Sequence, residues 1–167
     1  KLQEYLQKYH LSDLDRRFFT ELVYGVIRRK NYLDAIIVFF AKRPLKKLSS
    51  MVVEILRLGI YQIIYMDKVP ESAAVNESVK LAKKLTRGLS GFVNAVLRSV
   101  LRESDSISIG ELAKSEAEEI SFIYNQPLWL VNLWIKEMGK DKTVDLCAWF
   151  NEQPRLTARI NTVKVSI

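Results

Sequence analysis

The stretch "VPESAAVNESVKLAKKL" (residues 69–85) predicts a helix with a polar pair near its apolar stripe and a cluster of lysines at its end. Pro70 suits the first helical position, where the backbone N–H that proline lacks has no partner within the helix. Asn76 and Glu77 adjoin the stripe, so we predict that both are buried and make structural hydrogen bonds, with Asn94 as their companion in the next helix. The stripe itself recurs at helical spacing, at Ala74, Val75, Val79, Leu81, Ala82 and Leu85.

Helical spacing continues upstream of this stretch. The segment "LSDLDRRFFTELVYGVIRR" (residues 11–29) has Ser12 three residues before Asp15, a spacing similar to that of a capping box. Gly25 lies inside this helix at some cost in stability, which predicts that another helix passes close to it. The side chains predicted to form one wide inward face are Phe18, Phe19, Leu22, Val23, Val26 and Ile27.

Three further helices are predicted at about residues 32–41, 45–66 and 92–101, and Met51 is expected to face inward in the second of them. Together with a partial helix at the start of the chain, five helices joined by short connections predict a compact all-α bundle. No alternation typical of a strand occurs before residue 155.

The composition becomes polar, serine-rich and acidic near residue 103, which predicts a domain boundary. We expect one helical domain at residues 1–102, a linker with a short helix at 103–123, and the start of an incomplete second domain at 124–167.

Within that last part, residues 126–139 and 140–154 predict two helices. The apolar and polar residues alternate in "RLTARINTVKVSI" (residues 155–167), which predicts one strand. A single strand has no partner for its backbone groups, so the second domain is expected to be cut short.

The scarcity of cysteine and histidine restricts the possible chemistry. With only Cys147 and His10, the chain lacks the residues for a disulfide framework or a thiolate zinc cluster, and we predict no metal site and no catalytic residue. Cys147, Trp129 and Trp134 are expected in the core rather than as a nucleophile or as base-stacking groups. The longest apolar run, residues 35–41, is too short to cross a bilayer, and no signal peptide is apparent, so a cytoplasmic protein with no membrane partner is predicted.

The charge is unevenly distributed. Residues 1–102 hold 19 Lys and Arg against 9 Asp and Glu, a net charge of +10, whereas residues 103–167 hold 7 against 10, a net charge of −3. A basic module indicates a polyanionic partner, most often nucleic acid, and the alternative is a solubilising surface. Helix dipoles favour terminal cations by ~0.3–1 kcal/mol each, which explains one or two per helix but not the whole excess. The candidate RNA-binding residues are Arg16, Arg17, Arg28, Arg29, Lys30, Lys80, Lys83, Lys84, Arg87, Arg98 and Arg102.

The combination "VP…AVNE…LAK…FVN…LR" and the segment "DRRFFTELVYGVIRR" resemble the NusB-like helical domain over about residues 10–102. That family includes the bacterial transcription antitermination factor and the N-terminal RNA-binding domain of ribosomal RNA cytosine-5 methyltransferases of the RsmB (Sun) type. "YNQPLWLVNLWIKEMG" and "PRLTARINTVKVS" resemble the segment that opens the methyltransferase portion, which favours the methyltransferase branch.

The resemblance implies two packed three-helix bundles and a role in docking the enzyme on 16S ribosomal RNA. It also implies that the S-adenosylmethionine-binding and catalytic cysteine motifs lie downstream of Ile167, so we expect no cofactor in this portion and S-adenosylmethionine in the full-length parent. The family's arginine-bearing first helix is expected to begin upstream of Lys1. The alternative function is an antitermination or protein-interaction module that binds RNA and a ribosomal protein.

Overall fold

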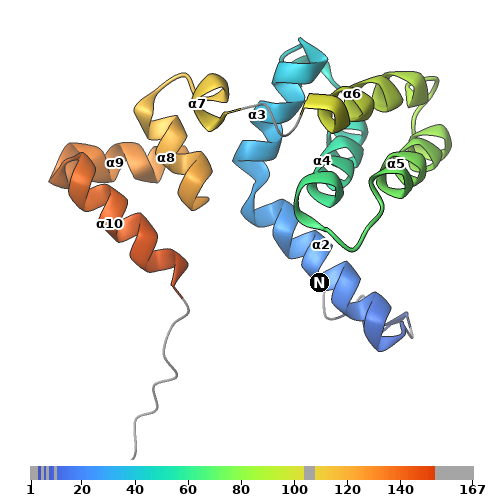
Figure 1. Ribbon diagram of the computed structural model, residues 1–167, viewed down its shortest axis with the longest axis horizontal. Helices are drawn as coiled ribbons and strands as arrows, with labels where there is room; N and C mark the ends of the chain where they lie inside the picture. Colours follow the sequence, from blue (N-terminus) through green and yellow to red (C-terminus); the bar gives the residue numbers. More distant parts are fainter. Residues whose placement is uncertain (1–3, 5, 7, 10, 104–107, 153–167) are drawn as a thin grey trace, which may run out of the picture.

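The computed structural model describes residues 4, 6, 8, 9, 11–103 and 108–152. Within these residues every regular element is helical, which confirms the predicted all-α class. The predicted strand at residues 155–167 lies outside the described residues. Figure 1 shows two groups of helices, one containing α2 to α6 and the other containing α7 to α10.

Helix α4 is the centre of the first group, because it contacts α2, α3, α5 and α6. Its buried side chains include Ile55, Leu56 and Ile60, which pack with fully buried side chains of α3 and α6 such as Leu33 and Leu97. Burial of such aliphatic side chains, at about 1.5–3 kcal/mol each, is the main source of stability for the bundle. The helices of this group are α2 (Asp13–Arg28), α3 (Lys30–Ala41), α4 (Ser50–Tyr65), α5 (Glu71–Leu85) and α6 (Ser90–Glu103).

Two predictions about α2 are confirmed. The helix begins after Ser12, whose side chain accepts a hydrogen bond from the Asp15 backbone N–H at 3.1 Å. Gly25 is the point at which α4 approaches, since a Cβ at this position would lie 2.0 Å from Cζ of Tyr61. The absence of a side chain at residue 25 therefore fixes how closely α2 packs on α4.

The predicted inward face of α2 is only partly confirmed, because Phe19, Leu22 and Val23 are half-buried. Only Val26 of the helix is buried, and Ile27 and Phe18 are 65% and 39% exposed. The reason is that α2 makes its packing contacts with α3 and α4, and its first half extends past them in Figure 1. An apolar face at helical spacing thus indicated the side that can be buried, but not how much of it these neighbours cover.

The helix predicted at residues 45–66 consists of two elements. A short 3-10 helix, η1 (Leu45–Lys47), precedes α4, and Leu48 and Ser49 separate them in an extended conformation. The Ser49 hydroxyl accepts a hydrogen bond from the Val52 N–H at 3.3 Å, which caps the start of α4. Met51, predicted to face inward, lies in the first turn and is 43% exposed.

The second group contains α7 (Ile109–Leu112), α8 (Glu116–Tyr124), α9 (Leu128–Met138) and α10 (Lys140–Asn151). The helices predicted at residues 126–139 and 140–154 are therefore confirmed. A small core of its own holds the last three of these helices together, formed by Ala117, Ile120, Val131 and Cys147.

The burial predicted for Cys147 is confirmed, and this burial raises the pKa of its thiol. The core position predicted for Trp129 was wrong, because this side chain is 69% exposed. Trp134 is half-buried and stacks on Phe150 with the ring centroids 5.7 Å apart. Its position at the edge of the small core reflects the size of that core, which has room for few large side chains.

The two groups pack against each other through α3. Helix α3 contacts α7 and α8, and the rings of Tyr32 and Phe122 lie 5.8 Å apart across this contact. Leu112 and Phe122 are buried in the core of the first group although they belong to the second. The predicted division at residues 102 and 123 stays a prediction.

Candidate nucleic-acid interface

The buried face of α5 differs from the prediction. Asn76 and Glu77 are both exposed, and the Glu77 side chain, 67% exposed, forms an ion pair with Lys80 on the same helix at 2.7 Å. Asn94 is half-buried and accepts a hydrogen bond from Nε of Arg98, also within its own helix, at 3.1 Å. The predicted buried network between α5 and α6 was therefore wrong.

Small side chains explain why α5 packs as it does. Ala74, Ser78 and Ala82 are buried and recur every four residues, so they form one stripe along the helix. Gly59 of α4 faces this stripe, because a Cβ at residue 59 would lie 2.8 Å from Oγ of Ser78. On the helical wheel, Asn76 lies about 200° from Ala74, and Glu77 lies about 100° from Ser78. Both side chains therefore point away from the stripe, toward solvent. The close contact between α4 and α5 thus leaves the polar pair on the surface.

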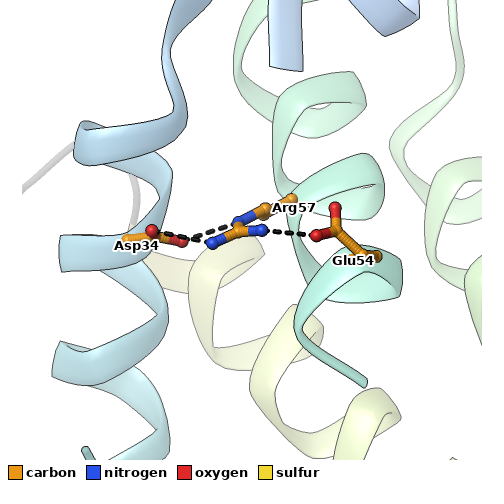
Figure 2. Close-up of polar contacts among 3 residues, drawn as sticks. All are labelled: Asp34, Glu54 and Arg57. Atoms are coloured by element: carbon orange, nitrogen blue, oxygen red, sulfur yellow. Dashed lines mark hydrogen bonds and ion pairs between the residues drawn. The ribbon is translucent and has the colours of Figure 1, made fainter. Parts of the chain in front are cut away.

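An ion-pair network around the buried Arg57, not predicted from the sequence, connects α3 and α4 (Figure 2). Arg57 donates to Asp34 from Nε at 2.7 Å and from Nη2 at 2.8 Å, and its Nη1 donates to Glu54 at 2.5 Å. The Arg57 side chain is only 10% exposed. Burial acts to lower the pKa of Arg57, but the hydrogen bonds and charges of Asp34 and Glu54 outweigh it and the net shift is upward. Glu54 three residues before Arg57 was the signal available in the sequence.

The cations at the junction of α2 and α3 are placed differently from one another. Arg28 and Lys30 are exposed, whereas Arg29 is half-buried with its guanidinium carbon 4.0 Å from the centroid of the Tyr65 ring. Burial raises the pKa of Tyr65, and the nearby charge of Arg29 acts in the opposite direction. Arg29 is thus held against α4 by a cation–π contact, while its neighbours are free to reach solvent.

The cations of α5 border a groove between α2, α4 and α5 with a volume of about 370 Å³. Lys80 and Lys84 line it together with apolar side chains from all three helices, namely Leu22, Leu58 and Leu81. Lys83 and Arg87 are close to these lysines in the sequence, and both are exposed to solvent. Because the ion pair of Lys80 with Glu77 is exposed, it contributes only about 0–1 kcal/mol and gives way easily to another anion.

The remaining predicted cations lie on α2 and α6. Arg16 and Arg17 are exposed near the start of α2, roughly 8–9 Å along its axis from Leu22 in the groove, and Arg28 lies roughly 9 Å on the other side. Arg98 and Arg102 are exposed on α6, which packs against α5, and Arg102 donates to the Ser99 hydroxyl at 3.3 Å. The structure therefore places two predicted cations, Lys80 and Lys84 of α5, in the lining of one groove, and the other predicted cations do not line it.

Comparison with known proteins identifies the first group of helices. Residues 1–102 match the profile of the NusB family. The chain belongs to the NusB family. This confirms the resemblance seen in the "AVNE" and "LAK" segments of α5, in which the alanines now have a structural explanation as part of the stripe against Gly59.

Individual relatives of this NusB-family chain fall into two kinds. The chain is 43% identical over 171 residues to the probable ribosomal RNA small subunit methyltransferase B of Synechocystis sp., a match that covers 96% of the chain and 36% of the relative. The protein of the same name from Bacillus subtilis is 33% identical, with 98% and 36% covered. The transcription antitermination protein NusB of Acetivibrio thermocellus is 35% identical over 99 residues, covering 58% of the chain and 68% of the relative. The chain spans about a third of the length of the curated methyltransferases it matches.

Two further observations concern the described part of this NusB-family chain. None of its helices has the length and hydrophobicity that crossing a bilayer requires. Among the same residues, no group of three or more His, Cys, Asp or Glu side chains is placed to hold a metal ion.

Proposed function

We propose that residues 1–102 are an RNA-binding module that docks a methyltransferase on small-subunit ribosomal RNA. The observation that carries this proposal is the extent of the sequence match. Relatives named as small subunit methyltransferase B match 90–98% of the chain, well beyond the NusB region, whereas the antitermination relative matches 58% of it. The segment after residue 102 therefore associates this chain with the methyltransferase branch.

The electrostatics of the NusB region support RNA as the partner. A net charge of +10 over residues 1–102 attracts the phosphate backbone, and each neutralised phosphate releases condensed counterions. The cations involved are those on α2, α5 and α6, with Lys80 and Lys84 at the groove as the central pair. Arg29 contributes charge from a fixed position against Tyr65, and Arg57 is excluded because its side chain is buried and paired with Asp34 and Glu54.

The same proposal includes the organisation of the longer protein. Residues 1–102 form the RNA-binding domain, residues 103–123 connect it, and residues 124–167 begin the methyltransferase portion. That portion uses S-adenosylmethionine as methyl donor, and the protein acts in the cytoplasm, where ribosomal RNA is found.

A second candidate function is an antitermination-type module that binds RNA together with a ribosomal protein. The observation in its favour is the 35% identity to an antitermination protein over 68% of that protein's length. Both functions use the basic surface for RNA, so RNA binding by itself does not separate them. They differ in whether a protein partner also depends on that surface.

Filter binding to fragments of small-subunit ribosomal RNA at three salt concentrations tests the proposal. The combined change of Lys83, Lys84 and Arg87 to Gln should weaken binding and flatten the dependence of affinity on salt, by a slope of roughly 0.7 for each single-strand phosphate that is no longer neutralised. The matched control is the combined change of Lys46, Lys47 and Lys68 to Gln, which removes the same charge from exposed positions outside the predicted interface. An equal reduction of affinity in the two variants would mean that only net charge matters, which contradicts a localised interface.

A further inference from the structure

A second groove, separate from the basic surface, opens between α3 and the helices α7, α8 and α9. Its volume of about 710 Å³ lies within the range of ~300–1,000 Å³ typical of sites that bind a ligand or a few side chains. Besides the buried Phe122, two exposed aromatic side chains line it from opposite groups of helices, Phe39 of α3 and Trp129 of α9. They are 44% and 69% exposed, so large apolar surfaces face solvent at this groove.

The charged lining of this groove is acidic, although the chain carries a formal charge of +7. Asp34, Glu111 and Glu118 line it, against a single lysine, Lys114. Asp34 is neutralised by Arg57, which leaves two carboxylates against one ammonium group.

Both of these carboxylates keep capacity for a further partner. One oxygen of Glu111 accepts from the Ser108 N–H at 3.1 Å, and one oxygen of Glu118 accepts from the Lys114 N–H at 2.7 Å. A carboxylate has about four acceptor positions, so each can receive additional hydrogen bonds from a cationic donor. The groove thus combines exposed aromatic rings with unsaturated acceptors.

This combination selects the class of occupant. RNA phosphates are repelled by the two carboxylates, and a purely apolar ligand leaves them unused. We propose that the groove docks a short segment of a partner protein in which a large apolar side chain stands next to Lys or Arg. The apolar side chain packs between Phe39 and Trp129, and the cation pairs with Glu111 or Glu118, an arrangement of a central anchor with a polar rim that is usual at protein interfaces.

A second copy of this chain is a poorer occupant. Among the described residues, Lys114 is the only cation that lines the groove. Insertion of any other cation of a second copy would therefore be head-to-tail and would generate open-ended chains rather than a closed pair. Two molecules that each carry +7 also repel one another.

Selection of random peptides displayed on phage against the chain tests the proposal without assuming a sequence. The expected result is enrichment of peptides that pair a large apolar residue with Lys or Arg. The fluorescence of Trp129 then reports where the peptides bind. The assay uses a variant with Trp134→Phe and Trp149→Phe, in which Trp129 is the remaining tryptophan, and synthetic peptides without tryptophan. Binding in the groove should shift the Trp129 emission to shorter wavelengths. No enrichment over the unselected library, or enriched peptides that leave Trp129 unchanged, would overturn the proposal.

Matched variants test the role of the carboxylates. Glu111→Gln and Glu118→Gln keep an acceptor for the backbone N–H groups and remove the charge, and each should weaken the peptide's affinity about three- to tenfold. Glu119→Gln makes the same change on an exposed position of α8 outside the groove and should have no effect. Phe39→Ala should weaken binding, and Met51→Ala, of nearly equal exposure, should not.

Two other results would refute the partner-protein assignment. In the first, ribosomal RNA fragments displace the peptide from its site at Trp129, which would make the groove part of the RNA-binding surface. In the second, sedimentation velocity shows self-association of the chain that increases with concentration, and Glu118→Gln abolishes this self-association. That result would make a second copy the occupant. Because neither experiment involves Lys83, Lys84 or Arg87, failure here leaves the proposed RNA binding untouched, and the reverse also holds.

Discussion

Replacing Asp34 with alanine removes the acceptor of two hydrogen bonds from the buried Arg57 guanidinium, 2.7 and 2.8 Å long. Removing one partner of a buried ion pair costs about 3–5 kcal/mol, because the other charge is left without compensation. Two features reduce this cost. Arg57 keeps Glu54 as a partner, and Asp34 lines the open groove beside α7, so water can reach the guanidinium. We therefore expect Asp34→Ala to lower the free energy of unfolding by about 2–3 kcal/mol.

The double variant of Asp34→Ala with Arg57→Met makes this prediction specific. An apolar side chain in place of the guanidinium leaves no buried charge, so the double variant should be more stable than Asp34→Ala alone. Urea denaturation followed by circular dichroism gives both free energies, and Asp34→Ala should also lower the melting temperature by about 4–12 °C. Asp67→Ala, which removes an exposed carboxylate, is the control and should change little.

A double variant as unstable as the sum of the two single variants would refute this reasoning. That result would mean that Asp34 and Arg57 contribute independently, and that the unpaired charge is not the source of the cost.

Three further predictions follow from single contacts. Glu77→Ala removes an exposed carboxylate beside Lys80, so it should change the free energy of unfolding by less than about 0.5 kcal/mol and slightly strengthen RNA binding. A loss of stability above about 1 kcal/mol in urea denaturation would contradict the surface position of Glu77. Gly25→Ala should destabilise the chain by about 1–3 kcal/mol, because steric overlap with Tyr61 exceeds the gain in helix propensity. Adding Tyr61→Leu should restore part of the lost free energy of unfolding in the same assay. Burial raises the pKa of the Cys147 thiol, so folding favours its protonated form, and that contribution is lost as the pH rises above the unfolded value of about 8.5. The stability difference between the chain and Cys147→Ala should therefore shrink between about pH 7 and about pH 10, whereas a constant difference would mean that the thiol does not titrate differently in the folded state.

The helices themselves could be predicted from the sequence because their signals are local. Ser12 before α2 and the small residue at Gly25 each produced the expected feature, a cap and a close helix contact. The break before α4 was less accessible, since leucines at 45 and 48 continue the apolar spacing into residues that do not belong to α4. The extended conformation of Leu48 and Ser49 stops the pattern there.

Burial was harder to predict than helix position, because it depends on neighbours distant in the sequence. Asn76 and Glu77 lie next to apolar residues in the chain, yet the surface that α4 contacts is the small stripe of Ala74, Ser78 and Ala82. Trp129 is a large, mainly apolar residue of the kind found in protein cores, yet it lies at a groove. In both cases the deciding fact is which helix packs on which face, and spacing alone does not contain it.

The same limit applies to the candidate interface, where net charge pointed to RNA without separating one arginine from another. Arg28, Arg29 and Arg57 look alike as residues of a basic segment or helix, yet one is exposed, one stacks on Tyr65 and one is enclosed by Asp34 and Glu54. Substituting Arg57 alone would reduce RNA binding indirectly, by destabilising the bundle, and substituting Arg29 would disturb the packing of α2 on α4. A reduced RNA affinity therefore identifies a phosphate-binding residue only when stability is retained, which restricts the informative positions to exposed cations such as Lys83, Lys84 and Arg87.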